Sequence, residues 1–286
     1  MQFTNVGGRM HALVDYDGEP WIAGLEATAL PLVPRAFLAA GGIASARSID
    51  LEPLAPLRTV RPGPIVPDPR MIWAIGLNYR DHAAETGRPL PTVPTVFVKS
   101  PGAVIASGDD IVVPAHVHEP DYEGEVALVI GERVRDATLD TALAAVAGVT
   151  IAHDVSARDH QYITGQFSWS KSFDTFCPLG PTLVTVDEID VNAIAIVTRL
   201  NGDIVQSSST AELVFDAAEL IVHLSQGCTL EPGDVICTGT PGGVGAARTP
   251  PRFLLDGDTI EIHVEGVGSL VNHVRRPETA PLHSGK

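Results

Sequence analysis

From residue 71 onward the chain is a succession of short apolar runs separated by turn-forming residues, and this spacing restricts its fold more than any other feature. Runs of this length, bounded by Gly, Pro, Asn or Asp, predict β-strands. The predicted strands are residues 71–79, 95–99, 110–114, 125–131, 149–155, 182–186, 195–205, 234–239 and 258–266. So many strands require a β-rich core.

Two segments between these strands predict helices. Residues 137–148 are rich in Ala and end at Gly148. Residues 210–227 predict a second helix with one apolar stripe. Its stripe and ends are Leu213, Ala217, Leu220, Ile221 and Leu224, with Ser209 or Thr210 as the N-cap and Gly227 at the C-terminal end. Because strands and helices do not alternate regularly, the fold class is predicted to be α+β rather than a doubly wound α/β sheet.

The first part of the chain has a different texture. Residues 1–68 alternate short apolar stretches with Gly and Pro, and a proline-rich stretch ends near Arg70. Proline disfavours regular structure, because its nitrogen carries no hydrogen and its ring fixes φ. We therefore expect a small N-terminal domain and Pro-rich linker over residues 1–68, and a main domain over residues 69–286.

Charge and composition exclude some classes of protein. The 286 residues include 19 Lys and Arg against 35 Asp and Glu, which gives a formal net charge of −16. Nucleic acid is excluded as an expected partner, because binding to phosphates relies on a surplus of basic residues. The three cysteines suggest neither a disulfide framework nor a cysteine zinc site. No apolar run approaches the roughly 20 residues of a membrane span, and no signal peptide is recognisable, so a cytoplasmic location without membrane association is expected.

Two carboxylates lead into the apolar run that starts at residue 125. Residues i and i+2 of a strand point to the same face, so Glu123 and Glu125 are expected to project side by side. Asp154 ends another predicted strand. Three hard oxygen ligands without cysteine match Mg²⁺ or Mn²⁺ better than zinc. The alternative is an exposed strand edge that carries solvated acids.

The chemical roles of three other residues, Lys171, His82 and Glu85, depend on the direction of their side chains. Lys171 is followed by Asp174, and such a lysine often forms only a surface ion pair. If it faces the three acids instead, then three carboxylates, one divalent cation and one lysine are neutral together. His82 and Glu85 are spaced i, i+3, so the carboxylate can orient the imidazole as a general base. A surface helix pair is the alternative for these two residues.

Two further motifs are weaker. His116 and His118, followed by Glu123, imitate the first metal motif of cupins, but residues 178–183 lack the histidine that the second motif requires. The two histidines are therefore expected to be loop residues. The glycine-rich residues 238–245 have neither a G-K-[ST] ending nor G-x-G-x-x-G spacing, so they predict a turn rather than a phosphate loop.

Taken together and in order, these segments resemble the fumarylacetoacetate hydrolase family. The similar segments are residues 76–85, 94–104, 121–131, 153–161, 171–181, 200–206 and 224–245. The resemblance implies a β-rich mixed sheet roll with a small N-terminal domain, in a homodimer, and it makes residues 69–286 the catalytic domain. Residues 1–68 are similar to the variable N-terminal domain of many members.

The resemblance also implies roles for individual residues. Glu123, Glu125 and Asp154 fall on the family's positions for ligands to Mg²⁺ or Mn²⁺, and Lys171 falls on its active-site lysine. The other implied residues are His82 and Glu85 as the dyad that activates water, and Arg158, Gln161 and Thr240 as contacts to the substrate's carboxylate and keto oxygens.

One position departs from the family pattern. Some members that cleave acylpyruvates have a basic residue immediately before Asn-Tyr, where this chain has Leu77. The change removes one anchor for a substrate carboxylate.

The implied activity is metal-dependent hydrolysis of a carbon–carbon bond in a 2,4-diketo acid or acylpyruvate, through an enolate that the metal stabilises. The expected partner is a small anionic 2-oxo acid. Decarboxylation of oxaloacetate-like acids, and isomerisation or hydration of 2-oxo-enoic acids, use the same enolate and stay open as alternatives. A catalytically silent binding protein is the alternative from another class.

Overall fold

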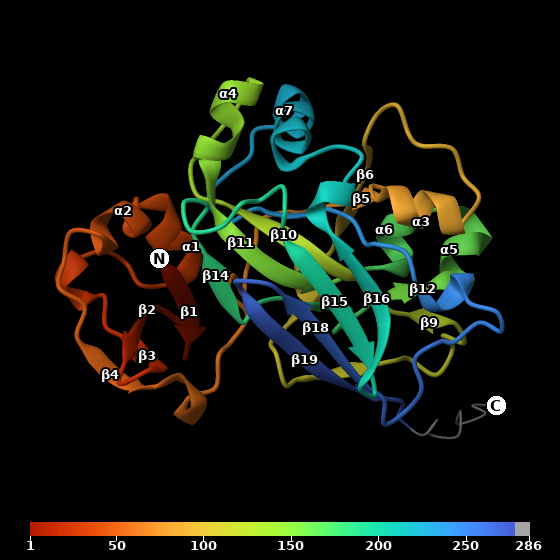
Figure 1. Ribbon diagram of the computed structural model, residues 1–286, viewed down its shortest axis with the longest axis horizontal. Coiled ribbons are helices and arrows are strands. Elements are labelled where there is room, and N and C mark those ends of the chain that lie inside the picture. Colours follow the sequence, from red (N-terminus) through yellow and green to blue (C-terminus); the bar gives the residue numbers. More distant parts are fainter. Residues whose placement is uncertain (278–286) are drawn as a thin grey trace, which may run out of the picture.

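Two mixed sheets organise residues 1–277, the part of the chain that the computed structural model describes (Figure 1). The larger sheet has ten strands, in the order β4 (Pro53–Pro56), β3 (Glu19–Ala23), β2 (Arg9–Tyr16), β1 (Gln2–Val6), β14 (Thr182–Val184), β11 (Val146–His153), β10 (Gly124–Ile130), β17 (Val235–Cys237), β5 (Ile72–Gly76) and β6 (Thr95–Lys99). The smaller sheet has five, in the order β16 (Asp203–Ser209), β15 (Ala195–Leu200), β18 (Thr259–Val264), β19 (Gly268–Arg275) and β8 (Asp110–Val112). The predicted β-rich α+β class is confirmed.

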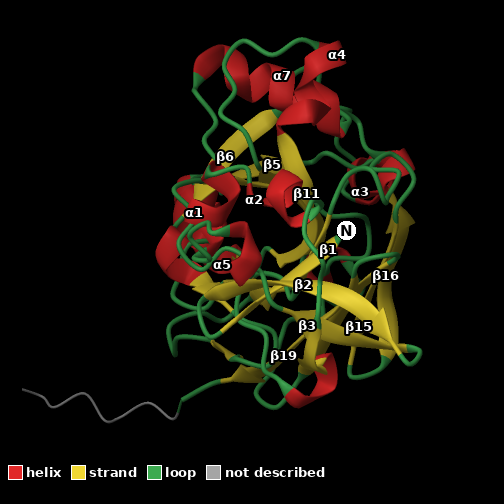
Figure 2. Ribbon diagram, turned by 90° about the vertical axis from the view of Figure 1, so that its left-hand side faces the viewer, coloured by secondary structure: helices red, strands yellow, loops and turns green. Residues whose placement is uncertain are grey.

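Short elements complete the fold. Two small sheets pair β12 (Ser156–Ala157) with β9 (Pro120–Asp121) and β13 (Cys177–Pro178) with β7 (Val104–Ile105). The α-helices are α1 (Pro34–Ala39), α2 (Gly42–Ala46), α3 (Arg80–Glu85), α4 (Leu139–Ala142), α5 (Arg158–Thr164), α6 (Phe167–Ser170) and α7 (Ala217–Gly227). Single 3-10 turns cover Glu26–Thr28, Leu57–Thr59, Pro101–Ala103, Leu143–Ala145, Thr210–Glu212 and Gly245–Ala247. Helices α4 and α7 pack together at one end of the molecule (Figures 1 and 2).

Strand β10 lies at the centre of the core, and all of its residues are buried. Val126 and Leu128 point into a cluster that contains side chains of the five-stranded sheet and of α7. Ala127 and Val129 point to the other face, into a cluster with residues of β1 and α1. A strand that is covered on both faces has a continuous apolar sequence rather than an alternating one, which explains the run that follows Glu125.

The N-terminal strands continue the large sheet. Strand β1 pairs with β2 on one side and with β14 on the other, with Phe3 opposite Leu183. The division at residue 68 stays a prediction, and residues 278–286 of the predicted main domain lie outside the described residues.

The first predicted helix is only partly formed. It consists of α4 and one 3-10 turn, and the chain enters β11 at Val146 instead of staying helical to Gly148. Val146 pairs with Ile130 and Gly148 with Val129. The pairing with β10 thus overrides the Ala-rich local pattern, so the prediction for residues 146–148 was wrong.

The second predicted helix starts later than expected. Helix α7 begins at Ala217, with Asp216 as its N-cap in a capping box with Glu219. Ser209 caps only the preceding 3-10 turn, and Leu213 forms a bridge to Tyr79 in extended conformation. The prediction was therefore wrong for the start of the helix. It was right for its end at Gly227 and for the buried stripe, which is Ala217, Leu220, Ile221 and Leu224.

The apolar run 195–205 is a hairpin rather than a single strand. Strands β15 and β16 pair with each other, and Leu200 lies opposite Asp203. Asn201 and Gly202 both have positive φ, at 54° and 93°. This is the conformation that a two-residue type I′ turn requires, and Asn-Gly is its preferred sequence.

Among the described residues, no helix is long and apolar enough to span a membrane. The three cysteines are free; Cys177 and Cys237 are buried, whereas Cys228 is exposed.

Thiol reactivity should follow this difference in exposure. Burial raises the pKa of Cys177 to about 12, and burial also raises that of Cys237 well above its usual value. Because the thiolate is the reactive form, we expect Cys228 alone to react rapidly with Ellman's reagent in the native protein, and all three cysteines to react after denaturation. In Cys228→Ser the rapid phase should disappear. A second rapid thiol in the native protein would contradict the packing around β13 and β17.

Candidate active site

Three buried carboxylates meet where β10 begins and β11 ends. The backbone N–H of Asp154 donates to the carbonyl oxygen of Glu123 at 2.9 Å, which continues the β10–β11 ladder past its last strand pair. Glu125 lies two residues beyond Glu123 and faces the same side. One oxygen from each of Glu123, Glu125 and Asp154 lies within 4.8 Å of the other two. The predicted proximity of the three acids is confirmed, and they do not form an exposed strand edge.

Lysine side chains neutralise part of this charge. Lys171 is 3% exposed, and its Nζ donates to Glu123 Oε2 at 2.6 Å and to Asp154 Oδ2 at 2.5 Å. It also lies over the ring of Phe97, 5.2 Å from the ring centroid. Lys171 thus faces the three acids and does not form a surface pair.

A second lysine, Lys99, is 1% exposed and was missed by the sequence analysis. Its Nζ donates to Asp154 Oδ1 at 2.5 Å, to the carbonyl oxygen of Phe176 at 3.0 Å, and to that of Lys171. These bonds hold Asp154 from behind and fix the backbone that carries Lys171. The only signal in the sequence was a lysine at the end of an apolar strand, β6.

Arg158 completes the inner charge network. Its guanidinium donates to Asp121 at 2.9 Å, to Glu123 at 2.5 Å and to the side-chain oxygen of Gln161 at 3.1 Å. Asp121 also accepts from the backbone N–H of Gly245 at 2.7 Å. Asp121 is a second residue that sequence reasoning missed, although its i, i+2 spacing from Glu123 was visible in the same segment.

The buried network around the three acids, which forms the inner wall of the site, contains more charged side chains than the sequence suggested. Four carboxylates (Asp121, Glu123, Glu125, Asp154) face three cations (Lys99, Lys171, Arg158). The metal-free network therefore has a formal excess of one negative charge, where the three acids with Lys171 alone would have two.

The pKa values of the acids reflect this imbalance. Burial acts to raise the pKa of Glu123, but the adjacent charges of Lys171 and Arg158 outweigh burial and lower it well below its usual range. Burial, together with the charges of Asp154 and Glu123, raises the pKa of Glu125 well above its usual range. A divalent cation would relieve this repulsion, and three buried oxygen donors are the ligand set that Mg²⁺ and Mn²⁺ prefer. The triad therefore fits a divalent metal.

The predicted dyad is formed on helix α3. His82 Nδ1 lies 2.8 Å from Glu85 Oε1, and Glu85 Oε2 accepts from the backbone N–H of Gly243 at 2.8 Å. With Nδ1 bound to the carboxylate, Nε2 of His82 is the ring nitrogen left for a ligand. Asp81 accepts from the N–H of Gly242 at 3.1 Å. Helix α3 is thus attached to the glycine-rich turn 238–245, which acts as a backbone donor and not as a phosphate loop.

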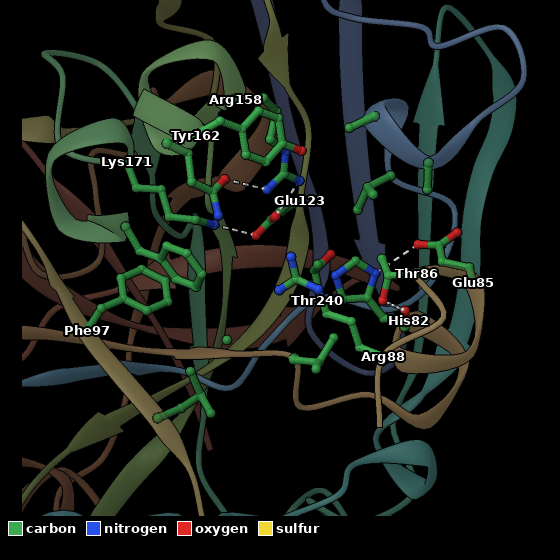
Figure 3. Close-up of a pocket in the computed structure, with 18 residues that line it drawn as sticks. His82, Glu85, Thr86, Arg88, Phe97, Glu123, Arg158, Tyr162, Lys171 and Thr240 are labelled. Carbon is green, nitrogen blue, oxygen red and sulfur yellow. Dashed lines mark hydrogen bonds and ion pairs between the residues drawn. The ribbon is translucent and has the colours of Figure 1, made fainter. Parts of the chain in front are cut away.

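Lys171 and the His82–Glu85 dyad line one cavity of about 320 Å³. Figure 3 shows Lys171 and Glu123 on one side of this cavity and His82 and Glu85 on the other. Arg158, Gln161 and Thr240 line it as well. A volume of this size suits a small ligand.

Thr240 and Gln161 differ in the hydrogen-bonding groups that remain free for a ligand. The Thr240 hydroxyl donates to the carbonyl oxygen of Gly124 at 3.0 Å and accepts from Gln206 Nε2 at 2.8 Å. Its first role is therefore to tie the start of β10 to the turn. Gln161 uses its oxygen for Arg158, and its amide nitrogen makes no bond to another described residue.

His116 and His118 lie in the loop between β8 and β9, as expected. Within residues 1–277 they belong to no group of three or more metal-ligating side chains, and the acid triad is the one such group found there. The cupin alternative is therefore not supported.

This combination of a β-rich roll and a buried acid triad beside a cavity is matched by known proteins. Residues 71–275 match the family described as fumarylacetoacetate (FAA) hydrolase C-terminal. Oxaloacetate tautomerase FAHD2A, mitochondrial, of Bos taurus is 42% identical over 251 residues, which cover 87% of this chain and 73% of the relative.

Solved structures are also similar to this chain. The 5-carboxymethyl-2-hydroxymuconate delta-isomerase of Mycobacterium smegmatis is 32% identical, with a TM-score of 0.79 over 98% of this chain and 100% of that one. The fumarylacetoacetate hydrolase of Exiguobacterium antarcticum is 34% identical, with a TM-score of 0.82 over 97% and 100%.

The chain belongs to the fumarylacetoacetate hydrolase family, and it is an enzyme of that family rather than a silent binding protein. The relatives' names include tautomerase and isomerase activities as well as hydrolysis, so membership does not choose the reaction. The homodimer and the cytoplasmic location remain predictions, and the bovine relative is described as mitochondrial.

Metal binding should depend on Glu125. The change Glu125→Gln keeps the size of the side chain and an acceptor for the N–H of Gly239, but removes one ligand charge. We expect the affinity for Mn²⁺ to fall by more than the roughly 10- to 100-fold typical of losing an outer-shell partner, as measured by calorimetric titration. The control Glu132→Gln changes an exposed acid just after the same strand and should bind Mn²⁺ normally. Equal affinities of the two variants would contradict the metal site.

Lys99 should stabilise the metal-free protein by charge compensation. Lys99→Met leaves Asp154 buried with one cation fewer, so the free energy of unfolding should fall by about 3–5 kcal/mol. Added Mn²⁺ should restore part of this loss, because it supplies positive charge to the same carboxylate. Urea unfolding with and without Mn²⁺ measures both effects. The exposed pair Arg61–Asp109 provides the control, and Arg61→Met should cost less than about 1 kcal/mol. A loss of that small size for Lys99→Met would refute the role of Lys99.

Proposed function

We propose that this protein is a Mg²⁺- or Mn²⁺-dependent enzyme that moves protons on small 2-oxo acids, and that keto–enol tautomerisation of oxaloacetate is its main activity. The observation that carries the proposal is the single cavity lined by Lys171 of the acid network and by the His82–Glu85 dyad. The named activity of the bovine relative supports the choice of oxaloacetate.

A divalent cation held by Glu123, Glu125 and Asp154 would act as a Lewis acid for the 2-oxo-carboxylate end of the substrate. Lys171 has three N–H donors, of which two are bound to Glu123 and Asp154. The third is available for the 2-oxo oxygen, where negative charge develops when the enol forms.

His82 is the proposed base at C3 of the substrate. In the keto-to-enol direction, Nε2 takes a proton from C3, the electron pair of that C–H bond forms the C2–C3 double bond, and the C=O π pair moves onto the 2-oxo oxygen. That oxygen takes a proton from solvent while His82 returns its proton to solvent, so no proton is gained or lost overall. The reverse direction returns a proton from His82 to C3. Glu85 fixes the ring through Nδ1, and the N–H of Gly243 holds Glu85 in turn. Tautomerisation releases no fragment and consumes no water.

Hydrolysis of an acylpyruvate or 2,4-diketo acid is the second candidate. A histidine oriented by a carboxylate can equally deprotonate a water that attacks the distal carbonyl, and this would use the same dyad. Decarboxylation of oxaloacetate requires no such base, so it should depend less on His82. The named hydrolase structure supports the hydrolytic candidate, and the named tautomerase supports the first.

His82→Ala tests the proposal. With Mg²⁺ present, conversion of enol oxaloacetate to the keto form should slow by about two to four orders of magnitude, the usual contribution of a positioned acid–base group. The loss of enol absorbance reports tautomerisation, and carbon dioxide release reports decarboxylation in the same sample. His118→Ala removes an exposed histidine outside the cavity and should have no effect. Wild-type turnover of acylpyruvates without turnover of enol oxaloacetate would replace the proposal by the hydrolytic candidate.

A further inference from the structure

The cavity holds one cation that the acid network does not use. Arg88 lines the cavity together with Arg158 and Lys171. The other two are bound to carboxylates, whereas no side-chain hydrogen bond or ion pair joins Arg88 to any other described residue. Figure 3 shows its side chain pointing into the cavity, toward His82 and Thr240.

The backbone gives Arg88 a defined position. Gly87 has a φ of +64°, its N–H donates to Ala84 O at 3.2 Å, and the N–H of Arg88 donates to Ala83 O at 3.1 Å. These two bonds form a Schellman motif at the end of α3, and glycine adopts its left-handed residue without strain. Arg88 is thereby fixed to the same helical turn that carries His82.

The charge balance of the cavity shows what Arg88 can bind. With a divalent metal, the inner network changes from one excess negative charge to one excess positive charge, which a single substrate carboxylate neutralises. A second carboxylate would then have no partner in the inner network. Glu85 adds negative charge on the opposite side of the cavity, its outer end, where Figure 3 shows it beside His82. Arg88 is exposed at this outer end, and a guanidinium binds a carboxylate through two parallel hydrogen bonds.

We propose that Arg88 binds the far carboxylate of the substrate and makes the enzyme selective for 2-oxo dicarboxylic acids over 2-oxo acids with an uncharged end. Arg88 thus takes the place of the basic residue that some family members have at the position of Leu77. It reaches the same cavity from a different segment of the chain. The inference rests on the proposed function for the inner end of the substrate, because the 2-oxo-carboxylate must face the acid network for its far end to reach Arg88.

Binding of a matched pair of ligands tests this. The Mg²⁺-loaded protein is titrated with 2-oxoglutarate and with its 5-methyl ester, which differ by one charge at the far end. We expect the wild type to bind the acid about 10- to 100-fold more tightly than the ester, and Arg88→Gln to lose that preference by weakening the acid alone. Arg80→Gln removes an exposed charge from the other end of α3 and should keep the preference.

The outcomes separate this inference from the proposed function. Equal affinity of the wild type for acid and ester, no binding of the acid, or equal weakening of both ligands by Arg88→Gln would overturn the role of Arg88. A wild type that prefers the acid but does not tautomerise oxaloacetate would refute the proposed reaction and leave Arg88 as the anchor. Arg88→Lys, which keeps the charge without the planar fork, should retain part of the preference.

Discussion

The cost of burying four carboxylates around the start of β10 determines much of the rest of this structure. Each of them would be expensive to remove from water without a partner. The three cations that compensate them come from β6, from α5 and from the residue after α6, so the chain between residues 99 and 171 must fold around the start of β10. The ion network and the fold therefore depend on each other, and a divalent metal would turn the network's excess negative charge into an excess positive one.

The two ends of the cavity are built differently. The inner end lies on strands β10 and β11, which are paired and buried on both faces. The outer end lies on α3, a helix of six residues with one buried side chain, Ala83, whose two acids accept bonds from Ser208, Gly242 and Gly243. Because elements with few buried contacts open most easily, we expect the outer end to open more easily than the inner end.

The sequence predicted this site where the signal was local. The i, i+2 spacing of Glu123 and Glu125 and the i, i+3 spacing of His82 and Glu85 follow from strand and helix geometry alone. The orientation of Lys171 and the role of Lys99 depend on contacts between segments far apart in the chain, which no spacing encodes. The same reason explains the late start of α7: Asn78 binds the backbone of residues 214 and 215, and this holds them in a bend outside the helix.

The inner network contains no feature that selects one reaction of the family over another. The same acids and lysine can stabilise an enolate whether it arises by proton transfer, by decarboxylation or by cleavage of a carbon–carbon bond. The choice must therefore depend on the rest of the cavity lining, to which Leu77 contributes an apolar side chain from a backbone with a φ of 56°. Leu77 offers no anchor for a substrate carboxylate, whereas Arg88, which follows α3, can pair with one. The proposed role of Arg88 therefore favours a 2-oxo acid with a second carboxylate, which would otherwise have no partner in the cavity.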